Sequence, residues 1–408
     1  MNTPSLHPVT PAERIVLLDV LRGFALLGIL LMNIEGFAGP LNTALTGIDP
    51  TLSGADRIAD ALVYFFVQGK FYTLFSMLFG MGFAVMSARA EGARRPFVPF
   101  YLRRSLGLLV IGLAHALLLW SGDILVSYAL LSLLLLAFAE APTRWLPAIA
   151  IGIYLLASAW VLLFGVIGTL AAHDATFQQQ LADVGAQWQQ GVEAQRQAFG
   201  HGTYLQATAQ RLRDFAESVR GLLVNGPTML GMFLLGAWFL RSGVIAAPQR
   251  HARLFAWLRW GVMPLGLVLM AASVWIAPYM DPTRLDISLA LAWALASVAN
   301  LLMCLGYLAW VTRLAHALRG LAPAGRMALS NYLLQSLLCT LLFYGYGAGL
   351  FERLPRAWQI PFALALFAVQ VGASHLWLRT FRFGPVEWLW RAFTYLQWPP
   401  MRRRNSVV

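Results

Sequence analysis

Long apolar segments recur along this chain and are separated by short polar stretches. A helix needs about 20 apolar residues to cross the hydrocarbon core of a bilayer. Windows of this length predict ten membrane spans: Ile15–Ile34, Gly69–Ser87, Ser105–Trp120, Ile124–Phe138, Leu146–Leu170, Gly221–Leu240, Trp260–Ala277, Ile287–Val311, Ala328–Leu350 and Ile360–Leu378. We therefore expect an all-α, polytopic membrane helix bundle that comprises residues 1–408 as a single membrane domain.

Two polar segments lie outside the predicted spans. In residues 171–220, apolar side chains such as Phe177, Leu181 and Trp188 recur at helical spacing, which predicts amphipathic helices. These helices could cap the membrane surface or cover a site as a lid. Residues 380–408 form a tail whose Pro385 and neighbouring tryptophans indicate a helix at the membrane interface.

Composition and charge support a membrane protein. The chain is 59% hydrophobic and 12% charged, with a mean hydropathy of +0.64. Its net charge of +12 does not indicate nucleic-acid binding, because no basic stripe with interleaved aromatic residues occurs in a polar segment. In the predicted topology, 20 arginines lie on the side of the two termini and eight on the other side. The positive-inside rule then predicts cytoplasmic termini and an extracytoplasmic segment 171–220.

The first predicted span carries polar side chains at membrane depth. Asp19 and Arg22 are spaced i, i+3 and can form an ion pair, and Asn33 lies eleven residues after Arg22 on the same helix face. A charge at this depth costs at least about 2.5–3.5 kcal/mol on insertion scales, so it commonly marks a functional site. The alternative is a purely structural ion pair.

His115 is the strongest candidate for acid–base chemistry. It lies in the third span, on the same helix face as Arg104, and Asp123 follows at the start of the next helix. A carboxylate that orients an imidazole beside a hydroxyl group is the arrangement that general-base catalysis needs. The alternative is a core histidine that only satisfies its hydrogen bonds.

The remaining candidates are each open to a structural interpretation. Lys70 could be an interface residue whose ammonium reaches the headgroups, and Asn331 and Gln335 could bond neighbouring helices. Cys304 and Cys339 fall inside spans and indicate core packing. The sequence has no metal-ligand spacing and no nucleotide-binding fingerprint.

Several motifs together resemble a known family. They are Leu18-Asp19-Val-Leu-Arg22-Gly, the Lys70-Phe stretch, Leu118-Leu-Trp120-Ser-Gly-Asp123, Gly325-Arg-Met-Ala-Leu-Ser-Asn331 and Phe383-Gly-Pro-Val-Glu-Trp-Leu-Trp-Arg391. This order is similar to that of the YeiB-like family of bacterial inner-membrane proteins, a domain of unknown function. The resemblance extends over nearly the whole chain and implies a multi-pass protein of the bacterial cytoplasmic membrane.

A more distant resemblance concerns activity. The first span is similar to that of transmembrane acyltransferases such as heparan-α-glucosaminide N-acetyltransferase, which carry an arginine and, eleven residues later, a histidine or an asparagine. Arg22 and Asn33 match this pattern. The acetyltransferase branch has a further histidine in the next outer loop, but this chain has none between Asn33 and Lys70. His115 or Glu35 would then supply the base, and we favour His115.

These observations lead to a functional hypothesis. We expect a membrane acyltransferase that moves an acyl group from cytoplasmic acyl-CoA to an extracytoplasmic sugar, lipid or small-molecule acceptor. His115 would accept the acceptor's proton, with Asn33 or Lys70 stabilising the oxyanion. Further candidates are Asp123 and Glu35 near the base, and, for the donor, Arg22, Asp19, Arg103, Arg104, Asn331 and Gln335.

Two alternatives come from other functional classes. A small-molecule or lipid transporter or flippase could use the same polar faces as a path, and a membrane scaffold would leave Asp19 and Arg22 as a structural pair. Apart from acyl-CoA as donor we expect no cofactor and no metal. The expected partners are membrane lipids, the acceptor and, as a possibility, a second copy of the chain.

Overall fold

A computed structural model describes residues 15–44 and 46–403. In these residues the chain forms helices joined by loops, with isolated β-bridges in place of strands. The α-helices are α1 (Val16–Ala38), α2 (Gly54–Phe66), α3 (Lys70–Gly92), α4 (Phe97–Leu118), α5 (Leu125–Leu134), α6 (Leu146–Leu170), α7 (Ala175–Gln195), α8 (Tyr204–Arg241), α9 (Ala252–Trp257), α10 (Met263–Ile276), α11 (Ile287–Arg313), α12 (Ala322–Arg326), α13 (Ala328–Phe343), α14 (Arg356–Thr380) and α15 (Pro385–Tyr395). The all-α class predicted from the sequence is confirmed.

The ten predicted spans all fall on helices, but they differ in length. Among the described residues, eight helical segments are long and apolar enough to cross a membrane, and Leu125–Phe138 and Ala328–Phe343 are shorter. The span expected to reach Leu350 ends at Phe343, because the chain turns there and the Gly345 N–H donates to the Phe199 carbonyl at 2.7 Å. This bond ties the end of α13 to the polar insertion.

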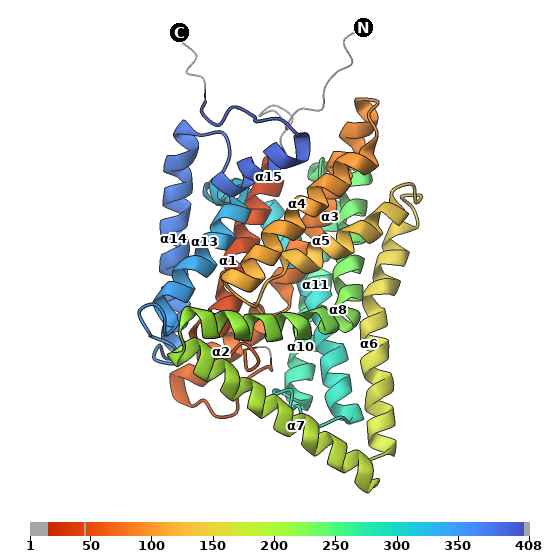
Figure 1. Cartoon of the computed structure of the whole chain (residues 1–408). Coiled ribbons are helices and arrows are strands. Elements are labelled where there is room, and N and C mark those ends of the chain that lie inside the picture. The colour runs from red at the N-terminus through yellow and green to blue at the C-terminus, as the bar shows by residue number, and fades with distance from the viewer. Residues whose placement is uncertain (1–14, 45, 404–408) are drawn as a thin grey trace.

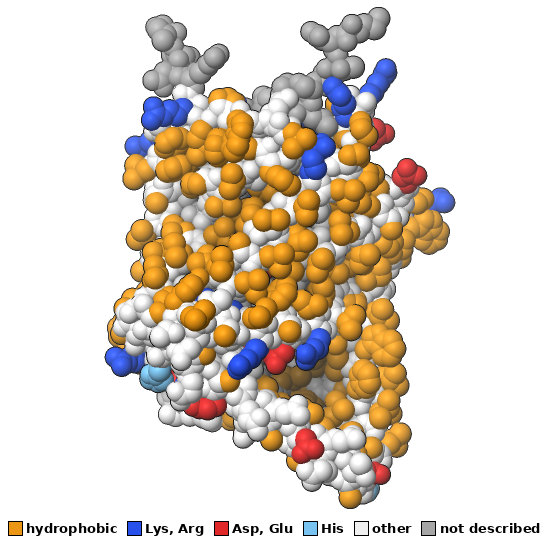
Figure 2. Space-filling model, in the orientation of Figure 1, with side chains coloured by type: hydrophobic (Ala, Val, Ile, Leu, Met, Phe, Trp, Pro, Cys, Tyr) orange, Lys and Arg blue, Asp and Glu red, His pale blue; other side chains and the backbone are white. Residues whose placement is uncertain are grey.

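The bundle has two distinct ends (Figure 1). The first residues of α1 and the whole of α15 lie at one end, which we call the α15 end. Helix α7 and the first part of α8 lie across the opposite end, which we call the α7 end. Figure 2 shows a broad hydrophobic band between these ends, with charged side chains gathered above and below it. This surface fits a protein that spans a membrane.

Helix α1 lies inside the bundle and packs against α3, α12, α13 and α14. The short helix α12 approaches α1 closely because Gly325 has no side chain. A Cβ atom at Gly325 would lie 1.9 Å from the Asp19 carbonyl oxygen. This contact places the start of α13 beside the charged residues of α1.

Helices α4 and α5 form a hairpin that ends inside the protein. The 14 residues Leu125–Phe138 are about 21 Å long if helical throughout, which is too short to cross a bilayer. The tip of the hairpin is held from the α7 end, because Tyr204 and Arg211 of α8 both donate to the Leu118 carbonyl, at 2.8 and 3.2 Å. The α4–α5 loop is thereby fixed between the interior of the bundle and α8 (Figure 1).

The polar insertion is helical, as its apolar pattern predicts. It contains α7, a π-helical turn (Arg196–His201) and the first part of α8, which begins with a capping box between Thr203 and Gln206. An ion pair of 2.8 Å between Arg196 and Glu352 anchors it to the loop after α13. Helix α8 first lies across the α7 end and then enters the bundle (Figure 1), and it contains an internal proline, Pro227.

Candidate functional site

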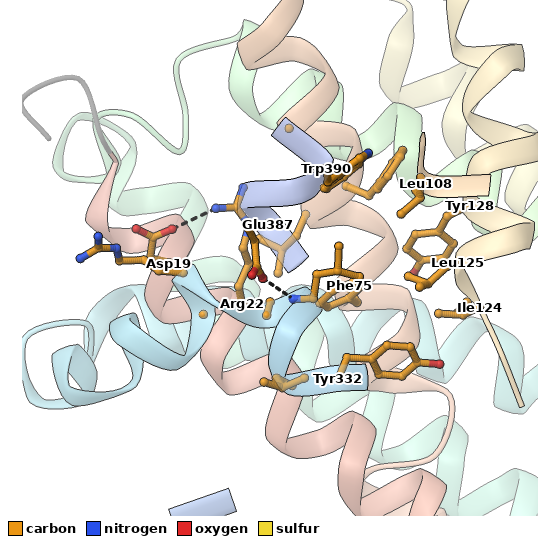
Figure 3. Close-up of a pocket in the computed structure, with 18 of the residues that line it drawn as sticks. Asp19, Arg22, Phe75, Leu108, Ile124, Leu125, Tyr128, Tyr332, Glu387 and Trp390 are labelled. Carbon is orange, nitrogen blue, oxygen red and sulfur yellow. Dashed lines mark hydrogen bonds and ion pairs between the residues drawn. The ribbon is translucent and has the colours of Figure 1, made fainter. Parts of the chain in front are cut away.

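A cavity lies in the half of the bundle that carries α15. Its volume is about 190 Å³, more than the ~150 Å³ of an engineered cavity that binds benzene. Figure 3 shows charged side chains at one side and aromatic and aliphatic side chains at the other. The lining residues include Asp19, Arg22, Leu26, Ile29, Phe75, Arg104, Leu108, Ile124, Leu125, Tyr128, Arg326, Tyr332, Glu387, Trp390 and Arg391.

Arginines dominate the charged side of the cavity. The Arg22 guanidinium pairs with Asp19 at 3.0 Å, yet its side chain remains 31% exposed. The Arg104 guanidinium lies 3.7 Å from the centroid of the Trp390 ring, and the Trp390 indole N–H donates to the Arg104 carbonyl at 2.8 Å. With Arg326 and Arg391, four arginines face two acidic residues, which makes the cavity suited to an anion.

Glu387 joins α15 to the start of α13. One oxygen of its carboxylate accepts from the backbone N–H groups of Leu329 and Ser330, at 2.8 and 3.1 Å, and the other accepts from the Ser330 hydroxyl. The bonds satisfy first-turn amides of α13. Burial raises the pKa of Glu387 above its ordinary value, although the bonds from Ser330 lower it in part.

His115 is the middle member of a hydrogen-bonded triad, Asp123, His115 and Ser336, just beyond the cavity. Its Nδ1 lies 2.6 Å from Asp123 Oδ2, and its Nε2 lies 2.8 Å from Ser336 Oγ. The second Asp123 oxygen accepts from the Val126 N–H at 2.8 Å at the start of α5. With Asp123 ionised, Nδ1 carries the proton and Nε2 accepts from the Ser336 hydroxyl.

Tyr332 lies between this hydrogen-bonded triad and the cavity. It lines the cavity, and its ring centroid lies 5.0 Å from that of His115. Ser336 follows one turn later in α13, and both Ser336 and His115 are buried. Ile124 and Leu125, which directly follow Asp123, also line the cavity. The side chain of Tyr332 therefore lies between His115 and the cavity.

Two predicted catalytic residues lie away from this centre. Lys70 is fully buried and donates to the Tyr64 carbonyl at 2.8 Å, so it does not reach the membrane surface as an interface lysine would. Glu35 pairs with Arg356 at 2.8 Å, and Arg356 also pairs with Asp60 at 2.9 Å. Neither Lys70 nor Glu35 lines the cavity.

Three predicted donor-binding residues bond other helices instead. Asn331 donates to Ser374 at 3.0 Å and Gln335 donates to Gln370 at 2.8 Å, which ties α13 to α14. Arg103 donates to the Thr394 carbonyl at 3.2 Å, next to the cavity but outside its lining. These side chains are used in helix packing.

Asn33 extends the polar face of α1. It is half-buried and lies two turns or less after Leu26 and Ile29, which line the cavity, but Asn33 is not itself part of the lining. Arg22 and Asn33 thus share a face, as their spacing predicts.

Four residues of the site are not predicted from the sequence: Ser336, Tyr332, Arg326 and Arg391. Ser336 is separated from His115 by 221 positions, and serines are common in membrane helices. A signal that could have found it is the i, i+4 spacing of Tyr332 and Ser336, which puts a phenol and a hydroxyl on one face of the predicted ninth span.

The fold and this site define a polytopic helical membrane protein with a buried polar centre. Residues 239–397 match a family described as a protein of unknown function (DUF418). The chain is 36% identical to the uncharacterized protein YxaH of Bacillus subtilis (strain 168), over 99% of this chain and all of that protein. It is 34% identical to the uncharacterized protein YeiB of Escherichia coli (strain K12), over 94% of this chain and 96% of that protein.

The chain therefore belongs to the YeiB-like family of proteins of unknown function, which confirms the family resemblance of its motifs. A third relative, an uncharacterized 39.9 kDa protein of Bacillus acidopullulyticus, is 29% identical over 96% of both chains. No solved structure matches this chain.

Proposed function

We propose that this chain is a membrane acyltransferase. It takes an acyl group from an anionic thioester, such as acyl-CoA, bound in the cavity, and transfers it to a hydroxyl or amine acceptor that arrives from the α7 end. The observation that carries this proposal is the environment of His115. An imidazole held at Nδ1 by Asp123 and facing a hydroxyl at Nε2 lies directly beyond an arginine-rich cavity.

The cavity suits a donor that is charged at one end and apolar along its length. Arg22 and Arg104 offer guanidinium groups to phosphates on the charged side. Leu26, Leu108 and Leu125 provide an apolar wall for the thioester arm and the acyl chain. A donor in this orientation brings its carbonyl carbon to Tyr332, next to His115.

The chemistry needs a base and a group that stabilises negative charge on the carbonyl oxygen. His115 acts as the base. The amide of Leu125, in the first turn of α5 and on the cavity wall, is a donor without an acceptor within the helix and can face the developing oxyanion. The Asn33 amide is a second candidate for this role.

The acceptor approaches from the other side of Asp123. A small cavity of about 10 Å³ lies there between α5 and α8, and its lining includes Ser121, Ser127 and Ser218 together with apolar residues of both helices. The first part of α8 covers it, and in the proposed reaction the bonds of Tyr204 and Arg211 to the Leu118 carbonyl break to admit the acceptor. In the predicted topology, the α15 end faces the cytoplasm, where acyl-CoA is present.

The test measures thiol release from acetyl-CoA and from a long-chain acyl-CoA, with purified protein and a periplasmic extract as the source of acceptor. Wild-type protein should release CoA thiol, and His115→Ala should be roughly 10²–10⁴-fold slower. His375→Ala is the matched control, because His375 is exposed and bonds only the Gly320 carbonyl. No thiol release by the wild-type protein, together with substrate or lipid movement across vesicles, would replace this proposal with a transporter or flippase.

A further inference from the structure

We propose that Ser336 is the nucleophile of this reaction and carries the acyl group as an ester between donor and acceptor. This inference rests on the proposed acyl transfer and adds a covalent intermediate to it. The observation behind it is that both nitrogens of His115 contact side-chain oxygens of opposite chemical character, a carboxylate at 2.6 Å and a hydroxyl at 2.8 Å.

The three side chains come from separate elements that fix their order. Asp123 is held at the start of α5 by the Val126 N–H, so its other oxygen stays aimed at His115 Nδ1. Ser336 projects from the middle of α13 to Nε2. A serine activated by an imidazole that a carboxylate orients is the arrangement of nucleophilic acyl transfer, and it is recognised by geometry and not by sequence order.

The position of Ser336 fits transfer in two steps. Tyr332, one helical turn before Ser336 on α13, lines the cavity, and its ring centroid lies 5.0 Å from that of His115. In the proposed reaction the Tyr332 ring rotates and gives the donor access to Ser336. On the other side of the loop that carries Asp123 lies the small cavity beneath α8. An acyl group on Ser336 would be placed between the two cavities, and the donor and the acceptor need not be bound at the same time.

Each step is balanced in atoms and protons. In the first, His115 Nε2 takes the proton of Ser336 Oγ while the oxygen forms an ester with the acyl carbon, and the same proton passes to the sulfur of the leaving thiol. In the second, Nε2 takes the proton of the acceptor hydroxyl or amine, the acceptor bonds to the acyl carbon, and the proton returns to Ser336 Oγ. Asp123 is a positioning residue in both steps.

The test incubates the purified full-length protein with radiolabelled acetyl-CoA in the absence of an acceptor. We expect a burst of thiol release and an acetyl group on the peptide that contains Ser336, located by mass spectrometry. Ser336→Ala should lose both the burst and the label. Ser132→Ala should keep both, because Ser132 is a fully buried serine whose hydroxyl pairs with that of Ser105 at 2.8 Å and not with an imidazole.

A conservative variant gives a chemical signature. Ser336→Cys should become acetylated as a thioester, which neutral hydroxylamine cleaves, whereas the wild-type ester should resist the same treatment. This difference locates the acyl group on the side chain at position 336 even if turnover of the variant is slow.

Two outcomes separate this inference from the proposed function. If Ser336→Ala still transfers acyl groups while His115→Ala does not, transfer is direct, so the inference is wrong and the acyltransferase proposal stands. If neither the wild-type protein nor any variant releases thiol, the proposed transfer from acyl-CoA fails. A fluorophosphonate probe, which modifies activated serines, then tests whether Ser336 is nucleophilic. Modification of Ser336 in the wild-type protein but not in His115→Ala supports an activated serine, and no modification contradicts it.

Discussion

Two groups of buried charges in this protein are built differently. At the α7 end, the Arg356 guanidinium contacts Glu35 at 2.8 Å, Asp60 at 2.9 Å and Gln359 at 2.7 Å, and its side chain is 5% exposed. At the α15 end, Arg22 pairs with Asp19 at one guanidinium nitrogen and remains 31% exposed, at the wall of a cavity. We call the first the closed group, because its guanidinium is surrounded by its own partners. We call the second the open group, because its guanidinium lies at the wall of a cavity.

The comparison shows what makes a membrane-buried charge a candidate site. Both groups would be expensive to place in lipid, so their presence in predicted spans does not distinguish them. The distinguishing property is hydrogen-bonding capacity that faces a cavity large enough for a ligand. By this criterion Arg22 and Arg104 are the candidates for binding the proposed donor, whereas the guanidinium of Arg356 is satisfied by its own partners.

The largest effect should come from breaking the closed group. Arg356→Met leaves the Glu35 and Asp60 carboxylates buried without their counter-ion, which should lower the free energy of unfolding by about 3–5 kcal/mol. Thermal unfolding of the purified protein measures this loss. Arg353→Met is the control, because Arg353 is exposed and lies three residues earlier. A variant of Arg356 as stable as the control would mean that the closed group is not structural.

A smaller effect should come from the open group, on binding and not on stability. Arg104→Gln removes a charge from the cavity wall and should weaken acetyl-CoA binding by about 1.5–3 kcal/mol, or roughly 10- to 100-fold. Arg103→Gln is a matched control, because Arg103 lies outside the lining and bonds the Thr394 carbonyl. Isothermal titration calorimetry compares them, and equal losses for both variants would contradict the assignment of the cavity to the donor.

The smallest effect concerns pH. Burial raises the pKa of Glu387 above its ordinary value of 4.5, so this carboxyl loses its proton at a higher pH than an exposed glutamate. Because ionised Glu387 adds negative charge beside the arginines, donor affinity should fall as pH rises through this pKa, by a few-fold. Glu387→Gln should bind the donor as the protonated wild type does and should lack this component of the pH dependence. An unchanged pH profile in the variant would exclude Glu387 from donor binding.

The sequence predicts the helices and part of the site. Windows of about 20 apolar residues locate all ten apolar helices, and helical spacing places Arg22 and Asn33 on one face, because these patterns are local. The pairing of His115 with Asp123 is also within reach, since both belong to one hairpin. Other contacts depend on tertiary packing, which no local sequence pattern contains. They are the contact of His115 with Ser336, the contribution of α15 to the cavity wall and the ion pair between Glu35 and Arg356.

The most direct test of the central claim is the sidedness of transfer. Proteoliposomes would enclose a periplasmic extract at the α7 end and receive radiolabelled acetyl-CoA at the α15 end. A Gln190→Cys variant without Cys304 and Cys339, labelled with an impermeant thiol reagent, would check the orientation. We expect that label becomes attached to enclosed acceptor, that acetyl-CoA itself stays outside, and that His115→Ala abolishes the transfer. Intact acetyl-CoA inside the vesicles, or label that enters equally with His115→Ala, would contradict it.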